Sequence, residues 1–250
     1  MRRYALSALF VALLLLAWHW AASLDSVDDL TLASPGETVD ALVDDWSLLS
    51  DNAWTTITEV LAGLALALVA GALLALCMHL WPPLHDAAYP VVLASQAIPI
   101  VVLAPIFVLL FDFGKGPAIA IVALICFFPI TLNLLAGLRS VEPELLKLMR
   151  SMGASRLRIL RSVELPSSLP SLFTGLKVAA TVSVAGAVFG EWAGGAEGLG
   201  RLVLTANNQL QTGRLYAGTV LLAAIAIALF MLAVLLERVT CPWNRKESSV

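Results

Sequence analysis

Charged residues are scarce in this chain. Asp, Glu, Lys and Arg together make up only 13% of its 250 residues, whereas 60% of the residues are hydrophobic. Soluble domains typically contain about 25% charged residues. The composition therefore excludes an ordinary soluble domain and predicts an all-α membrane protein that crosses the bilayer several times.

The sequence also lacks the common motifs of catalytic and metal sites. It has no G-x4-G-K-[ST] phosphate-binding loop, no G-x-S-x-G nucleophile motif and no H-E-x-x-H pair. Gly114-Lys115-Gly116 has the wrong spacing for a phosphate-binding loop. The histidines and cysteines show no metal-ligand spacing: His19, His79, His85, Cys77, Cys126 and Cys241. We expect no catalytic residue, no metal site and no cofactor bound by this chain.

Apolar runs dominate what is present. A bilayer-spanning helix needs about 20 apolar residues. Six runs are long enough, at residues 4–22, 57–80, 88–111, 118–138, 172–192 and 215–236. Trp81-Pro82-Pro83 breaks the chain after the second run. The first run is predicted to be a retained anchor, and a cleaved signal peptide is the alternative because small residues follow it at Ala21-Ala22-Ser23.

The charge distribution predicts the orientation. Residues 24–51 contain eight acidic residues and no Lys or Arg, so the positive-inside rule places this segment outside the cell. Six spans then leave both termini in the cytoplasm, which agrees with the basic Arg2-Arg3 and Arg245-Lys246. Part of the acidic segment is predicted to be an amphipathic helix on the outer surface or, alternatively, a solvated linker. Glycines and polar residues form a second external segment at 193–214.

A polar island at residues 139–170 separates the fourth and fifth runs. Its six Lys and Arg residues exclude it from the bilayer, since each costs about 2.5–3.5 kcal/mol at the bilayer centre. Pro143 and Gly153 are predicted to bound a first short helix, and Ser155 is predicted to cap a second helix that Pro166 and Pro170 end. The first helix has an apolar face: Leu145, Leu148, Met149 and Met152. Such an elbow is predicted to fit a groove in a partner protein.

The spacing of this island resembles a known signature. Gly153, nine residues, Val163, one residue and Leu165-Pro166 resemble the second half of the EAA loop of permease subunits in binding-protein-dependent ABC importers. Lys147-Leu148-Met149 stands where that family usually has Glu-Ala-Ala. The resemblance implies a coupling helix within residues 139–171 that docks into a separate ATPase subunit. The implied docking residues are Leu145, Leu148, Met149, Met152, Gly153, Ala154 and Ser155.

Residues 52–243 resemble the nitrate/sulfonate/taurine branch of these permeases. The stretches most similar to permeases for thiamine-precursor pyrimidines such as hydroxymethylpyrimidine are residues 96–99, 126–130, 138–141, 150–155 and 190–192. The resemblance implies a type I ABC importer permease fold in the inner (cell) membrane and an assembly of two permease copies, two ATPase subunits that bind ATP and magnesium, and an external substrate-binding protein. Sulfonates or taurine, nitrate and riboflavin remain alternative substrates.

Polar and helix-breaking residues inside the apolar runs are the candidates for a substrate pathway, since irregular backbone in a membrane must face protein or a water-filled cavity. These candidates are Gln96, Pro99, Asn133, Thr181, Ser183, Glu191 and Trp192. Glu191 is predicted either to face the pore mouth or to reach water at the membrane interface, and Trp192 equally fits an aromatic interface belt. Gly186 and Gly190 are interpreted mainly as helix-packing residues.

Other functional classes fit less well. An ion-gradient-driven secondary transporter would need intramembrane charges, and the spans offer few beyond Glu59 and Lys177. The missing motifs disfavour an intramembrane enzyme, and the elbow disfavours a structural scaffold.

Three regions are predicted: residues 1–53 with the first helix and acidic segment, residues 54–241 with the permease domain, and a cytoplasmic tail at 242–250. Membrane lipid is an expected partner, and nucleic acid is not.

Overall fold

The computed structural model describes residues 2–23 and 32–243, and this part of the chain is α-helical without a β-strand. The acidic residues Asp25, Asp28 and Asp29 and the basic pair Arg245-Lys246, which the orientation prediction uses, lie outside the described residues. The elements are α1 (Arg2–Ala22), α2 (Pro35–Asp44), α3 (Trp46–Leu80), α4 (Pro82–Ser95), α5 (Ile100–Phe111), α6 (Lys115–Arg139), α7 (Pro143–Ser151), α8 (Arg156–Ile159), η1 (Leu160–Glu164), α9 (Leu165–Gly194), α10 (Leu199–Asn208) and α11 (Thr212–Thr240).

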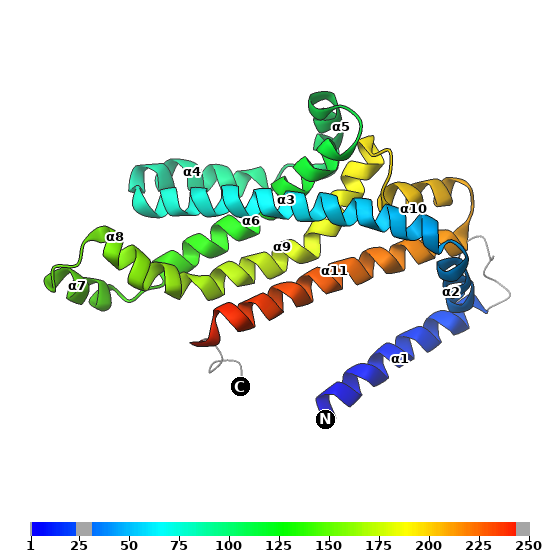
Figure 1. Cartoon of the computed structure of the whole chain (residues 1–250), viewed down its shortest axis with the longest axis horizontal. Helices are drawn as coiled ribbons and strands as arrows, with labels where there is room; N and C mark the ends of the chain where they lie inside the picture. Colours follow the sequence, from blue (N-terminus) through cyan, green and yellow to red (C-terminus); the bar gives the residue numbers. More distant parts are fainter. Residues whose placement is uncertain (1, 24–31, 244–250) are drawn as a thin grey trace.

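Long apolar helices form the body of the protein. Among the described residues, four segments are long and apolar enough to cross a membrane: α3, α6, the stretch Arg156–Gly194 and α11. The bent pair α4 and α5 brings the number to five if it counts as one span. In Figure 1, α3, α6, α9 and α11 run along the long axis, with α7 and α8 at one end and α2 and α10 at the other. The count of six spans therefore stays a prediction.

The third expected span is corrected by the structure, because it is not one continuous helix. α4 ends at Ser95 and α5 begins at Ile100, and the two helices are bent by 102°. Pro99 between them has an extended backbone, with φ −64° and ψ 118°. A proline has no N–H to donate and disfavours the helical conformation of the residue before it, so the helix ends here.

The prediction that Pro166 and Pro170 end the second loop helix is wrong. α8 continues through the π-helical turn η1 into α9, with Pro166 in the first turn of α9 and Pro170 inside it. Within η1 the hydrogen bond spans five residues, from the N–H of Leu165 to the carbonyl of Leu160. The helix therefore passes from the polar island into the span without interruption.

Glycines bring α6 and α9 into close contact. A Cβ added at Gly175 would lie 2.5 Å from the carbonyl oxygen of Pro129. One added at Gly186 would lie 2.9 Å from Cδ1 of Ile125, and Gly190 lies directly against Ala118. The interpretation of Gly186 and Gly190 as packing residues is confirmed. The adjoining core is apolar and draws on α3, α6 and α9: Val60, Leu64, Val122, Ile130, Ala179 and Val184.

The acidic segment contains the helix that one of its two alternatives predicts, and the position of this helix on the outer surface stays a prediction. Ser34 and Glu37 form a capping box at the start of α2: Ser34 Oγ accepts from the Glu37 N–H at 3.2 Å, and the Glu37 carboxylate accepts from the Ser34 N–H at 2.8 Å. At the other end of α2, Asp45 accepts two hydrogen bonds from Arg214, at 2.7 and 2.9 Å. This bidentate pair ties the junction of α2 and α3 to the start of α11.

We expect Asp45→Asn to lower the melting temperature Tm in detergent at neutral pH. The hydrogen bonds from Arg214 hold the pKa of the Asp45 carboxyl below its ordinary value of 3.8. A lowered folded-state pKa stabilises the protein above the unfolded-state pKa, and this stabilisation is lost as the pH falls through the folded-state pKa. Both side chains are partly exposed, so the contribution at neutral pH is about 1 kcal/mol or less.

The measurement compares Tm at about pH 7 and about pH 3. The difference in Tm between Asp45→Asn and the unmodified chain should be smaller at the lower pH. The exposed neighbour Asp44 provides the control, and Asp44→Asn should change Tm little at either pH. If the difference in Tm is the same at both pH values, the stabilisation does not come from the ionised Asp45 carboxylate.

Candidate functional site

The polar island forms a loop with two short helices at one end of the molecule. We define the docking loop as residues 140–164, between α6 and α9. Pro143 is in the first turn of α7, as expected. Gly153 has φ +80°, a left-handed conformation that favours glycine, and the N–H groups of Gly153 and Ala154 bond the carbonyls of Arg150 and Met149 at the end of α7. The helix–glycine–helix elbow is confirmed.

The second helix of the docking loop begins where the sequence predicts. Ser155 has an extended backbone, and its hydroxyl oxygen accepts a hydrogen bond from the Arg158 N–H at 3.4 Å. This is the geometry of an N-cap. Ser155 thus fixes where the chain turns into α8, one residue after the half-buried Ala154.

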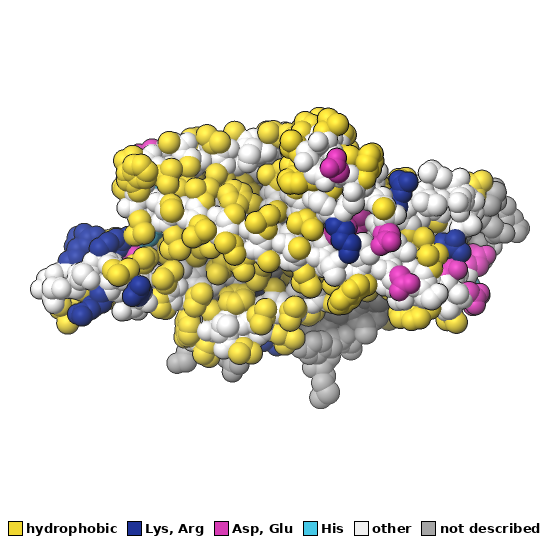
Figure 2. Space-filling model, turned by 45° about the horizontal axis from the view of Figure 1, so that its top comes forward, with side chains coloured by type: hydrophobic (Ala, Val, Ile, Leu, Met, Phe, Trp, Pro, Cys, Tyr) yellow, Lys and Arg dark blue, Asp and Glu magenta, His cyan; other side chains and the backbone are white. Residues whose placement is uncertain are grey.

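The docking loop presents an apolar face that no described residue covers. α7 has no buried residue. Leu145 is 41% exposed, Leu148 is 56% exposed and Met152 is 75% exposed, while Met149 is half-buried. Figure 2 shows Lys and Arg side chains gathered at this end of the molecule, with a broad apolar surface between them and the acidic residues toward the opposite end. An exposed apolar face beside basic residues, such as that of α7, is typical of a protein contact surface.

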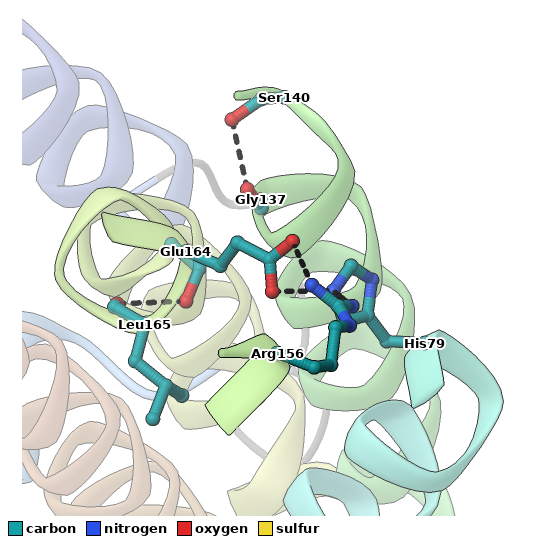
Figure 3. A network of polar contacts seen from close by, with 7 residues as sticks. His79, Gly137, Ser140, Arg156, Glu164 and Leu165 are labelled. Carbon is teal, nitrogen blue, oxygen red and sulfur yellow. Dashed lines mark hydrogen bonds and ion pairs between the residues drawn. The ribbon is translucent and has the colours of Figure 1, made fainter. Parts of the chain in front are cut away.

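A buried polar network joins the docking loop to the long helices (Figure 3). The carboxylate of Glu164, at the end of η1, accepts from Arg156 Nη1 at 2.5 Å and contacts His79 Nε2 at 3.0 Å. Arg156 begins α8, and His79 lies in the last turn of α3. Sequence reasoning missed this network. The available signal was Glu164 itself, an acid between the apolar residues Val163 and Leu165.

A cavity of about 420 Å³ opens beside the break between α4 and α5. The structure brings two predicted pathway residues to it, Gln96 from the break and Asn133 from α6. Asn133 donates through Nδ2 to the Pro129 carbonyl at 2.8 Å. Most of the other lining residues are apolar and include Ile98, Leu103, Phe128, Leu132 and Val182. The cavity can therefore hold a mainly apolar or flat molecule with a few polar contacts.

The other pathway candidates lie outside the lining of this cavity. Pro99 caps the start of α5 next to it. Thr181 is exposed and donates to the Val178 carbonyl, and Ser183 is buried and donates to the Ala180 carbonyl. Trp192 is 43% exposed and donates to the Gly200 carbonyl at 2.9 Å. Their assignment to a pathway stays a prediction.

Glu191 is fully buried and hydrogen-bonded rather than open to water. Its carboxyl group accepts from the Thr56 hydroxyl at 2.6 Å and from the N–H groups of Gly200 and Arg201, at 2.5 and 3.2 Å, at the start of α10. Anions are stabilised at a helix N-terminus by the free N–H groups there. The alternative that Glu191 reaches water at the membrane interface is corrected, because α3 and α10 enclose it.

The two ionisable residues singled out in the spans, Glu59 and Lys177, differ in their surroundings. Glu59 is 1% exposed, and its Oε2 has no hydrogen-bond partner among the described residues. Lys177 pairs with Glu237 of α11 at 3.0 Å. Within the described residues, no group of three His, Cys, Asp or Glu side chains is placed to hold a metal ion.

Comparisons with known proteins agree with this geometry. Residues 48–240 match the family described as "Binding-protein-dependent transport system inner membrane component". The chain is 35% identical to the formylaminopyrimidine transport permease protein ThiX of Halalkalibacterium halodurans, over 96% of both chains. It is 28% identical to the taurine transport system permease protein TauC of Escherichia coli, over 97% of this chain and 91% of the relative.

The fold is also similar to a solved structure. A chain of the MetNI methionine ABC transporter, in an inward facing conformation, superimposes with a TM-score of 0.70. The match has 19% sequence identity and covers 79% of this chain and 98% of that chain. The helical arrangement is therefore that of an ABC importer permease.

Proposed function

Because this chain belongs to the family of binding-protein-dependent transport system inner membrane components, we propose that it is the transmembrane permease subunit of an ATP-driven importer. The observation that carries the proposal is the docking loop, whose apolar face is exposed at Leu148 and Met152. A separate ATPase subunit, which binds ATP and magnesium, would cover this face. The chain itself would bind no cofactor and catalyse no reaction, and an external binding protein would deliver the substrate.

The proposed arrangement is a type I importer permease with six spans, both termini in the cytoplasm and two copies forming the pathway. α1 would be the first span and α4 with α5 the third. The basic docking loop supports a cytoplasmic position for that end. In Figure 1, the start of α1 and the end of α11 both point toward the half of the molecule that holds α7 and α8.

The proposed substrate is a thiamine-precursor pyrimidine. The likeness to ThiX over 96% of both chains supports this choice. The cavity supports it as well, because Phe128 offers an aromatic side chain while Gln96 and Asn133 offer amides that can donate and accept hydrogen bonds. Sulfonates or taurine, nitrate and riboflavin are the alternatives, and the likeness to TauC favours the first of them.

Two measurements test this proposal. Calorimetry of the cognate external binding protein against hydroxymethylpyrimidine, formylaminopyrimidine, taurine, nitrate and riboflavin identifies the substrate. Tight binding of taurine alone would replace the pyrimidine assignment and keep the permease. Uptake into proteoliposomes that contain the permease, its ATPase and the binding protein should require ATP and survive collapse of ion gradients. Uptake that stops with the gradient would indicate a secondary transporter.

We expect Gln96→Ala to raise the substrate concentration needed for half-maximal uptake by up to about tenfold, since one hydrogen bond contributes about 0.5–1.5 kcal/mol. Gln96 is exposed and lines the cavity, so its truncation should not affect folding. Thr174 is an exposed residue of α9 outside the cavity lining, and Thr174→Ala is the control. If Gln96→Ala and Thr174→Ala reach half-maximal uptake at the same substrate concentration, the cavity is not part of the substrate pathway.

A further inference from the structure

Three segments that are distant in the sequence meet at Glu164. His79 is 85 positions from Glu164 and 77 positions from Arg156. His79 ends α3, Arg156 begins α8, and Glu164 is the last residue before α9. Figure 3 shows both oxygens of the Glu164 carboxylate directed at the two basic side chains. We refer to these three residues as the latch.

Burial distinguishes the latch from an ordinary surface ion pair. The Glu164 side chain is 2% exposed and that of His79 is 9% exposed, whereas Arg156 reaches in from the surface with 43% exposure. Exposed ion pairs contribute little because water competes for both charges. A buried carboxylate is different, since the loss of its partner leaves an uncompensated charge away from water. The docking loop is thus held against the end of α3 by a contact that is costly to open.

His79 keeps α3 attached through either of two contacts. Its Nε2 lies 3.0 Å from Glu164 Oε2 and 2.9 Å from Arg156 Nη2. With a hydrogen on Nε2 the ring donates to Glu164, and without one it accepts from Arg156. Arg156 and Glu164 both belong to the docking loop. α3 therefore remains joined to the docking loop in either tautomer of His79.

The connectivity shows why such a contact matters. α6 and α9 are covalently continuous with the docking loop, and a displacement of the loop reaches them through the backbone. α3 has no such connection, because α4 and α5 separate it from α6. α7 buries no residue, and the apolar link between the docking loop and α3 runs through Leu160 of η1, which shares a core cluster with Ala75 and Met78. The side chains of the latch therefore add a directional polar connection between α3 and the part of the chain proposed to meet the ATPase.

We propose that His79, Arg156 and Glu164 are positioning residues that transmit the movement of the docking loop to α3 and so couple ATP hydrolysis to transport. This inference rests on the proposed function. The latch itself touches neither substrate nor ATP. Its loss should leave the ATPase bound and active while less of each hydrolysis event reaches the transmembrane helices.

The test measures substrate imported per ATP hydrolysed by the complete complex in proteoliposomes. Arg156→Ala and Glu164→Gln should each lower this ratio by about tenfold, within the usual range of coupling between sites, with the ATPase still copurifying and hydrolysing ATP. Both act through one contact, so the double variant should be no worse than the worse single variant. Arg156→Lys, which keeps the charge, should restore part of the ratio. Arg214→Ala breaks an arginine–carboxylate pair at the opposite end and should leave the ratio unchanged.

The outcomes separate the latch from the proposed function. A normal ratio in both single variants would overturn the latch alone. An equal loss in Arg214→Ala, or no recovery in Arg156→Lys, would show a general structural effect and also overturn it. Absence of ATP-dependent uptake by the unmodified complex would overturn the proposed function and the latch with it. If Glu164→Gln does not assemble, the partly exposed Arg156 still decides the question.

Discussion

Replacing Leu148 with aspartate is expected to abolish most ATP-dependent uptake while the chain stays folded in the membrane. Leu148 is 56% exposed on α7, so its side chain contributes little to the fold. Full burial of a leucine in a partner's groove contributes about 1.5–3 kcal/mol, and an unpaired aspartate there would add a desolvation cost. A loss of this size weakens docking by at least about tenfold.

Copurification of the ATPase and uptake in proteoliposomes measure this effect. Leu148→Met conserves the volume and apolar character of the side chain and should retain docking.

Gly153→Pro tests the elbow separately, because proline requires φ near about −65° whereas Gly153 has φ +80°. This substitution should displace α7 relative to α8 and reduce uptake as well. Normal docking by Leu148→Asp would place the ATPase contact elsewhere.

Replacing Glu191 with alanine should give the largest loss of stability. The change leaves the N–H groups of Gly200 and Arg201 without their acceptor, and it removes one of two acceptors of the Thr56 hydroxyl, which also lies 3.2 Å from the Asn52 carbonyl. Each buried donor left without a partner costs about 1–3 kcal/mol. Because these donors come from α3 and α10, the connections between α9 and both helices weaken together. We expect a lower Tm in detergent and a lower yield of assembled complex.

Two substitutions act as references for Glu191→Ala. Glu191→Gln keeps an acceptor oxygen in place and should lose less stability. Glu197→Ala removes an exposed acid of the same segment, whose contact with Thr55 is long at 3.5 Å, and should have a small effect. If Glu191→Ala melts at the same temperature as Glu197→Ala, the hydrogen bonds to Glu191 do not hold the helices together.

The sequence predicted the docking loop well because its signals are local. Pro143 begins a helix, Gly153 takes a left-handed conformation and Ser155 caps the next helix, and each of these depends on a few neighbouring residues. The long apolar runs likewise predicted helices from length and composition. The rule that proline ends a helix failed at Pro166, where a π-helical turn lets the helix continue. The same rule held at Pro99, where length and composition had predicted one continuous third span.

Contacts between distant residues could not be predicted. The latch joins residues 77 and 85 positions apart, and no periodicity relates them. The second external segment was predicted from its glycines and polar residues and contains α10, whose first N–H groups bind Glu191. Glu191 stood out as an acid at the end of an apolar run. Its partners became visible only once α3, α9 and α10 were placed together.

The glycine contacts between α6 and α9 have a mechanical consequence. The carbonyl of Pro129 at Gly175, and Ala118 at Gly190, leave no space for these helices to slide along each other. The docking loop joins the adjacent ends of α6 and α9, so we expect the two helices and the loop to move as one rigid unit. A displacement of the docking loop should then tilt α6 and α9 together, and the tilt should reach the opposite ends of both helices. Glu191, one residue beyond Gly190, would pass that tilt to α10.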